Sequence, residues 1–93
     1  MKTLNVKDTK DLIEKVSDVE LTGNQDAWVL LCKASSKSQG WMKSTKVMQI
    51  HGSEQGVIVQ VTTQQGDNVS EALTYVPFAL LVDHGEGIYT IEN

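Results

Sequence analysis

The residues best suited to bind a ligand lie in one short segment, from Trp41 to Lys46. Two ammonium groups, two hydroxyl groups and one indole occur there within six residues, directly after a polar stretch that holds Lys37. Lysine brings positive charge to phosphate, hydroxyl groups donate to phosphate oxygens, and an indole ring offers a stacking surface for a base. The candidate ligand-binding residues are therefore Lys37, Trp41, Lys43, Ser44, Thr45 and Lys46.

The same segment has a plainer interpretation. In an extended strand, Lys43 and Thr45 share one face, whereas Ser44 and Lys46 share the other. Lysines in such a strand also protect a sheet edge against aggregation, with Trp41 packed at the edge of the core. Both interpretations stay open at the level of the sequence.

Charge is sorted along the chain, whose net charge is −4. Residues 27–53 carry four lysines and no acid, whereas residues 54–93 carry six acids and no basic residue other than histidine. This separation creates a field that attracts an anionic partner to the basic segment, or it merely solubilises one hairpin. All eight basic residues are lysines, although arginine is the usual choice for bidentate phosphate contacts.

Residues suited to catalysis are few. Cys32 lies inside an apolar run, so we expect a buried and unreactive thiol. His51 and His84 each adjoin a glycine and are expected to be solvated turn residues. One cysteine and two histidines without close spacing do not make a zinc site, and no phosphate-binding loop or nucleophile motif occurs. We therefore expect no enzymatic activity, no metal and no cofactor.

The length of 93 residues predicts a single domain spanning 1–93. The one cysteine excludes an intramolecular disulfide, no apolar run is long enough to span a bilayer, and the N-terminus lacks a signal-peptide pattern. These features predict a soluble protein of the reducing cytoplasm without membrane association.

The elements that must position the candidate residues follow from periodicity. A short extended piece at Thr3–Val6 precedes a helix over about 8–18, with Asp8 as N-cap and an apolar stripe along one side. After residue 26 we expect only strands between turn signals, at 28–32, 41–50, 57–64, 71–76, 78–83 and 87–92. The segment 28–32 is apolar on both faces, which is typical of a central, covered strand. The predicted fold class is α+β, with one N-terminal helix packed on a strongly bent antiparallel sheet or a small, partly open β-barrel of five to six strands.

The apolar phases of these elements predict the core and the assembly. The predicted core residues are Leu12, Val16, Val29, Leu31, Val57, Val59, Val61, Leu73 and Leu80. The small size and the apolar segment 77–82 predict a homo-oligomer, most simply a twofold dimer.

Three segments together carry a resemblance. They are Gly40-Trp41-Met42-Lys43-Ser44-Thr45-Lys46, Val59-Gln60-Val61-Thr62-Thr63-Gln64-Gln65 and Glu71-Ala72-Leu73-Thr74-Tyr75-Val76-Pro77. As a block they resemble small, uncharacterised accessory proteins of tailed bacteriophages. The resemblance implies action inside a bacterial host cell, by binding nucleic acid or a host protein. Phe78 stands where a small turn residue is expected.

The sequence leaves three alternative functions open. The leading expectation is a non-enzymatic binding module that holds single-stranded nucleic acid or a nucleotide through the Lys/Trp hairpin. One alternative is an inhibitor of a host or defence component that docks through the acidic C-terminal half. The other is a structural protein that forms oligomers.

Overall fold

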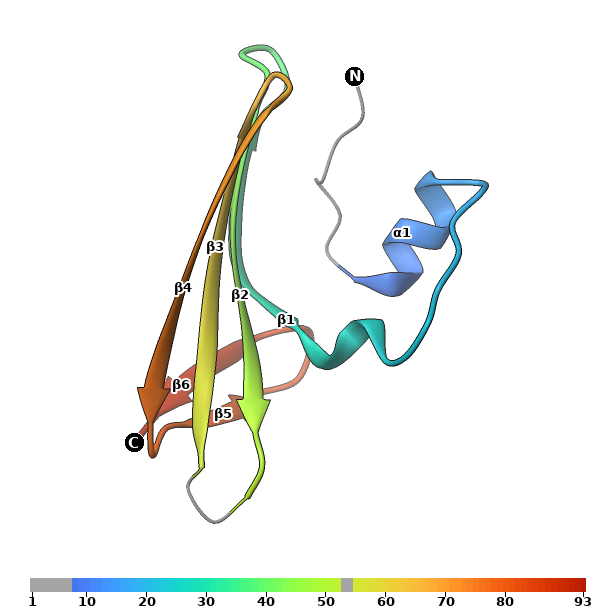
Figure 1. Cartoon of the computed structure of the whole chain (residues 1–93). Helices are drawn as coiled ribbons and strands as arrows, with labels where there is room; N and C mark the ends of the chain where they lie inside the picture. Colours follow the sequence, from blue (N-terminus) through green and yellow to red (C-terminus); the bar gives the residue numbers. More distant parts are fainter. Residues whose placement is uncertain (1–7, 53–54) are drawn as a thin grey trace.

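The structure is a computed structural model that describes residues 8–52 and 55–93. One short helix and a 3-10 turn precede six strands (Figure 1). The elements are α1 (Thr9–Lys15), η1 (Gln25–Ala27), β1 (Val29–Ser36), β2 (Trp41–Ile50), β3 (Gly56–Gln65), β4 (Asn68–Pro77), β5 (Leu80–Asp83) and β6 (Tyr89–Glu92). The extended piece expected at Thr3–Val6 lies outside the described residues.

The strands form two antiparallel sheets. β1 to β4 make a four-stranded sheet in sequence order, and β5 pairs with β6 in a separate hairpin that crosses one end of the large sheet (Figure 1). The prediction of an antiparallel fold with one helix is confirmed, but the single bent sheet or partly open barrel is wrong. At Pro77 the chain has no amide to extend the ladder, and Phe78 adopts a φ of 62°, which redirects the chain into the second hairpin.

The register assigns each side chain to one face of the large sheet. Val47 lies opposite Val59 and Gln49 lies opposite Val57, so these residues share one face, which we call the hairpin face because β5 and β6 pack on it. Met42 and its even-numbered neighbours in β2 occupy the other side, the Met42 face. Between Leu30 and Cys32 the register of β1 shifts, so the facing of its residues changes there.

The core lies between the hairpin face and the β5–β6 hairpin. Val47, Val57 and Ala79 are fully buried. The half-buried residues that pack against them are Val29, Leu31, Val59, Val76, Leu81 and Ile91. Gln49 joins the two sheets, because its Oε1 accepts from the Leu81 amide at 2.7 Å and its Nε2 donates to the Gly56 carbonyl at 2.8 Å.

The core prediction holds only in part. Val57 is fully buried as expected, and five further predicted residues are half-buried: Leu12, Val29, Leu31, Val59 and Val61. Val16, Leu73 and Leu80 are exposed. Leu73 is exposed because it lies in the edge strand β4 and its side chain is on the Met42 face, away from the hairpin.

The helix is shorter and less buried than the sequence predicts. Asp8 is the N-cap as expected, and its side chain accepts from the Asp11 amide at 2.8 Å. The helix ends at Lys15, because Val16 is already extended, and none of its residues is buried. The expectation that it plugs one face of the sheet is therefore wrong. Seven residues expose too narrow an apolar stripe for such packing, and Ile13 points largely into solvent.

Candidate nucleic-acid interface

The β1–β2 turn places the first candidate residue at one end of the large sheet. The Gly40 amide donates to the Ser36 carbonyl at 2.9 Å, and Gly40 has a φ of 73°, a conformation that favours glycine. The Gln39 amide donates to Ser36 Oγ at 3.2 Å, which closes the turn. Lys37 lies in this turn and is exposed.

Three of the candidate residues share the hairpin face of β2. Trp41, Lys43 and Thr45 follow one another on this face, beyond the part that packs against β5 and β6. Lys43 is exposed, whereas Trp41 and Thr45 are half-buried. We call this end of the hairpin face the distal platform; Figure 1 shows that the β5–β6 hairpin crosses the opposite end of the sheet.

The neighbours of Lys43 on the distal platform are small and uncharged. Ala34 of β1 and Thr63 of β3 lie opposite Lys43, and Ser70 of β4 follows Thr63 in the next register position. The other strand residues of the platform are Cys32, Ser36, Val61, Gln65, Asn68 and Ala72. No strand residue that the register assigns to this platform is acidic; the nearest acid along the chain at this end is Asp67, in the turn between β3 and β4.

Ser44 and Lys46 lie on the Met42 face instead. Ser44 is buried, so its hydroxyl group is not available to a surface ligand. Lys46 is half-buried and lies opposite Leu30 and Gln60. The structure therefore brings together Trp41, Lys43 and Thr45 and separates them from the other two residues.

The charge of Lys46 acts on Asp26 rather than on the platform. Thr9 donates to Asp26 Oδ1 twice, from its hydroxyl group at 2.6 Å and from its amide at 3.0 Å. These hydrogen bonds, with a smaller contribution from the Lys46 charge, hold the pKa of Asp26 below its usual value of 3.8. Asp26 thereby ties the start of α1 to the segment that leads into β1.

Cys32 corrects one expectation. The thiol was expected to be buried in a central strand, but Cys32 is exposed. The reason is that β1 is an edge strand, and the register shift after Leu30 directs Cys32 to the hairpin face opposite Thr45. The sequence could not reveal this, because the irregularity of β1 leaves no pattern in the residue types.

The two histidines are exposed in turns, as expected. His84 Nε2 lies 2.7 Å from Thr90 Oγ1, and Thr90 donates in turn to Glu92 at 2.8 Å. Among residues 8–52 and 55–93, no group of three or more His, Cys, Asp or Glu side chains is placed to hold a metal ion. No helix in the same residues is long and apolar enough to cross a membrane.

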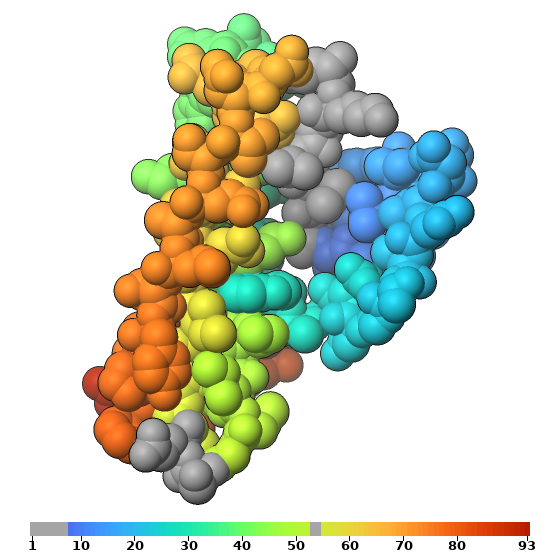
Figure 2. All heavy atoms as spheres, viewed as in Figure 1, coloured from blue at the N-terminus to red at the C-terminus, as the bar shows by residue number. Residues whose placement is uncertain are grey.

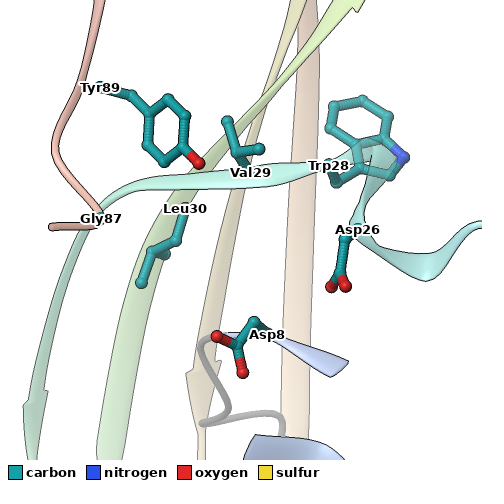
Figure 3. Close-up of a pocket in the computed structure, with 7 residues that line it drawn as sticks. All are labelled: Asp8, Asp26, Trp28, Val29, Leu30, Gly87 and Tyr89. Atoms are coloured by element: carbon teal, nitrogen blue, oxygen red, sulfur yellow. The ribbon is translucent and has the colours of Figure 1, made fainter. Parts of the chain in front are cut away.

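A pocket of about 330 Å³ lies beside β1, away from the candidate residues. Its lining comes from distant parts of the chain (Figure 3): Asp8, Asp26, Trp28, Val29, Leu30, Gly87 and Tyr89. Both carboxylates serve the fold, since Asp8 caps α1 and Asp26 binds Thr9. The sequence gives no sign of this pocket, because its residues come from 8–30 and from 87–89 and share no local motif.

Comparison with known proteins places the chain in a family. No match was found among curated proteins or among solved structures. The model of the Lockin family matches residues 1–90, which is nearly the whole chain. The chain therefore belongs to the Lockin family.

Proposed function

We propose that the protein is a non-enzymatic binding module that holds single-stranded nucleic acid or a nucleotide on the distal platform. The observation that carries the proposal is that half-buried Trp41 and exposed Lys43 share one face, on which no strand residue is acidic. A bacterial host cell, taken from the phage resemblance, is the proposed setting.

Each part of the platform has a distinct task in this proposal. The ring of Trp41 stacks on a base, because every base presents a π-face to an aromatic side chain. Lys43, and Lys37 at the adjoining turn, attract the phosphate groups. Thr45 and the exposed Thr63 supply hydroxyl groups to the phosphate oxygens. Ser44 and Lys46 have no part in it, because they lie on the Met42 face.

Fluorescence polarisation with labelled oligo-dT and oligo-rU over a salt series tests the proposal. We expect Lys43→Ala to weaken binding and to flatten the salt dependence by about one unit of slope. Trp41→Ala should weaken binding by about 1 to 3 kcal/mol per stacked base and leave the slope nearly unchanged.

Lys33→Ala is the matched control. Lys33 is exposed on the same β1–β2 hairpin and lies opposite Ser44, so it belongs to the Met42 face. The Lys33→Ala variant should bind oligonucleotide as tightly as the wild type. If Lys33→Ala and Lys43→Ala weaken binding equally, the attraction is diffuse and not specific to the platform. If the wild type does not bind at low salt, the proposal is refuted.

The acidic C-terminal half supports a second candidate, an inhibitor that docks on a basic protein surface. Between Phe78 and Glu92 the chain exposes three large apolar side chains, Phe78, Leu80 and Ile88, together with Asp83, Glu86 and Glu92. Apolar contacts ringed by charge are a usual composition for a protein interface. A host protein retained by the wild type and lost with Ile88→Lys would favour this candidate; equal retention by both would oppose it.

A further inference from the structure

β4 leaves one side of the large sheet open. It is the last strand of the sheet, and within residues 8–52 and 55–93 no strand pairs with its outer side. Figure 2 shows β4, in orange, running along one margin of the molecule from end to end. Ten residues is long for an exposed sheet edge, and Glu71 is the one charged residue in it.

The hydrogen bonds at both ends of β3 and β4 show which backbone groups face outward. The Gly66 amide donates to the Gly40 carbonyl of the neighbouring hairpin at 3.0 Å. Because backbone groups alternate in direction along a strand, the amide and carbonyl of Gln65 point the other way, toward β4. At the far end of β4, the Phe78 amide donates to the Gln55 carbonyl, which fits the same alternation. The even-numbered residues of β4 thus bond to β3.

The odd-numbered residues of β4 therefore direct their amide and carbonyl groups outward. They are Val69, Glu71, Leu73 and Tyr75, and their side chains all lie on the Met42 face. Val69, Leu73 and Tyr75 are 47%, 64% and 50% exposed. One edge thus combines free hydrogen-bonding groups with an apolar stripe.

The two edges of the large sheet differ in protection. β1 carries an irregularity after Leu30, an exposed lysine at Lys33, and contacts with β6. β4 has no lysine and no irregularity, and its one proline, Pro77, is its last residue. Natural edges are usually blunted by such devices, and β4 has only the single charge of Glu71, which favours a strand that another strand covers.

We propose that β4 pairs with β4 of a second copy of the chain, antiparallel about a twofold axis, with Ala72 opposite the partner's Ala72. In this register Val69 lies opposite the partner's Tyr75, and Glu71 lies opposite the partner's Leu73. All four outward-facing residues then meet outward-facing partners and form about eight hydrogen bonds. Val69 and Tyr75 become a cross-strand pair of β-branched and aromatic side chains.

The charge and the proline of β4 select this register over its neighbours. A shift that sets Glu71 opposite the partner's Glu71 brings two like charges together. The opposite shift sets Val69 opposite the partner's Pro77, which has no amide to donate. The ring of Tyr75 lies against Gly56 of β3, where a Cβ would come within 2.6 Å of it, so any side chain larger than glycine there would displace the ring.

Light scattering and cysteine cross-linking at micromolar concentration test the dimer. The wild type should have twice the 10.2 kDa mass of one chain. Leu73→Pro removes an outward amide that β3 does not use, so it should give a folded monomer. Leu73→Glu should also give a monomer, because it sets a second carboxylate opposite the partner's Glu71. Circular dichroism checks that both variants fold. A monomeric wild type, or a dimer that survives both substitutions in folded protein, would overturn the proposal.

The register has its own test in a Cys32→Ser background. Ala72→Cys places two thiols across a non-hydrogen-bonded pair with Cα atoms about 4.5 Å apart, a distance that a disulfide spans. Ser70→Cys is the matched control, since Ser70 is exposed on the same face but lies opposite the partner's Thr74. Ala72→Cys should cross-link in high yield and Ser70→Cys should not; equal yields would refute this register. Monomeric Leu73→Pro should still bind oligonucleotide if the platform works, so the two proposals fail separately.

Discussion

Gln49 is the polar joint between the two sheets, and its replacement tests how the β5–β6 hairpin is held. The side chain accepts from the Leu81 amide at 2.7 Å and donates to the Gly56 carbonyl at 2.8 Å. Longer contacts from Nε2 reach the carbonyls of Ile50 at 3.2 Å and Ala79 at 3.4 Å. Gln49→Met keeps the size of the side chain and removes both hydrogen-bonding groups.

The expected loss follows from the contacts at Gln49. Each of the two short hydrogen bonds contributes about 0.5 to 1.5 kcal/mol net, and a half-buried amide left without a partner costs about 1 to 3 kcal/mol. Since Leu81 packs against the core, its amide cannot readily form a replacement hydrogen bond with water. We expect Gln49→Met to lower the free energy of unfolding by about 2 to 4 kcal/mol. That is a large part of the about 5 to 15 kcal/mol typical of a domain.

Urea denaturation followed by circular dichroism measures this loss. The midpoint should fall while the slope of the free energy against urea stays constant, because the folded surface is unchanged. Gln65→Met is the control, since Gln65 is exposed at the end of β3, far from the hairpin. A similar loss in both variants, or a loss under about 0.5 kcal/mol in Gln49→Met, would refute the role given to Gln49.

Three further predictions concern the tether, the strained turn and the core. Because hydrogen bonds from Thr9 lower the pKa of Asp26, their contribution to stability is present above about pH 4 and is lost as the pH falls through the folded-state pKa. The difference in unfolding midpoint between wild type and Asp26→Ala should therefore shrink from about pH 7 to about pH 2, and a constant difference would contradict this. Phe78→Gly should raise the free energy of unfolding by up to about 1 kcal/mol in denaturant titrations, because Phe78 has a left-handed backbone and is 70% exposed; a loss of stability would argue for an unseen packing role. Val57→Ala should cost about 2 kcal/mol and exposed Ile13→Ala under about 0.5 kcal/mol by the same titration, and equal costs would place the core elsewhere.

The strands could be predicted because their signals are local. The residues of β2 were predicted as Trp41–Ile50, which are its bounds, and the turn at 66–67 follows from Gly66 beside polar residues. Period-two alternation also predicted that Lys43 and Ser44 face opposite sides, which the register confirms.

The arrangement of the elements could not be predicted because it depends on contacts between distant residues. The apolar run of β1 suggested a central strand, yet β1 is an edge that contacts β6. The apolar stripe of the helix carries no information about whether a partner surface lies within reach, and α1 has no buried residue. The absence of acids around Lys43 emerged only from the pairing of four strands, which no single segment encodes.

Cys32 gives the protein a natural attachment point for a spectroscopic probe. It is the one cysteine of the chain and its thiol is exposed on the hairpin face, opposite Thr45. A maleimide dye or nitroxide on this thiol would therefore sit at the margin of the distal platform without any engineered substitution. Its emission or mobility would show whether an oligonucleotide occupies the platform, and double electron–electron resonance between nitroxides would show whether two copies assemble and how far apart their Cys32 residues are.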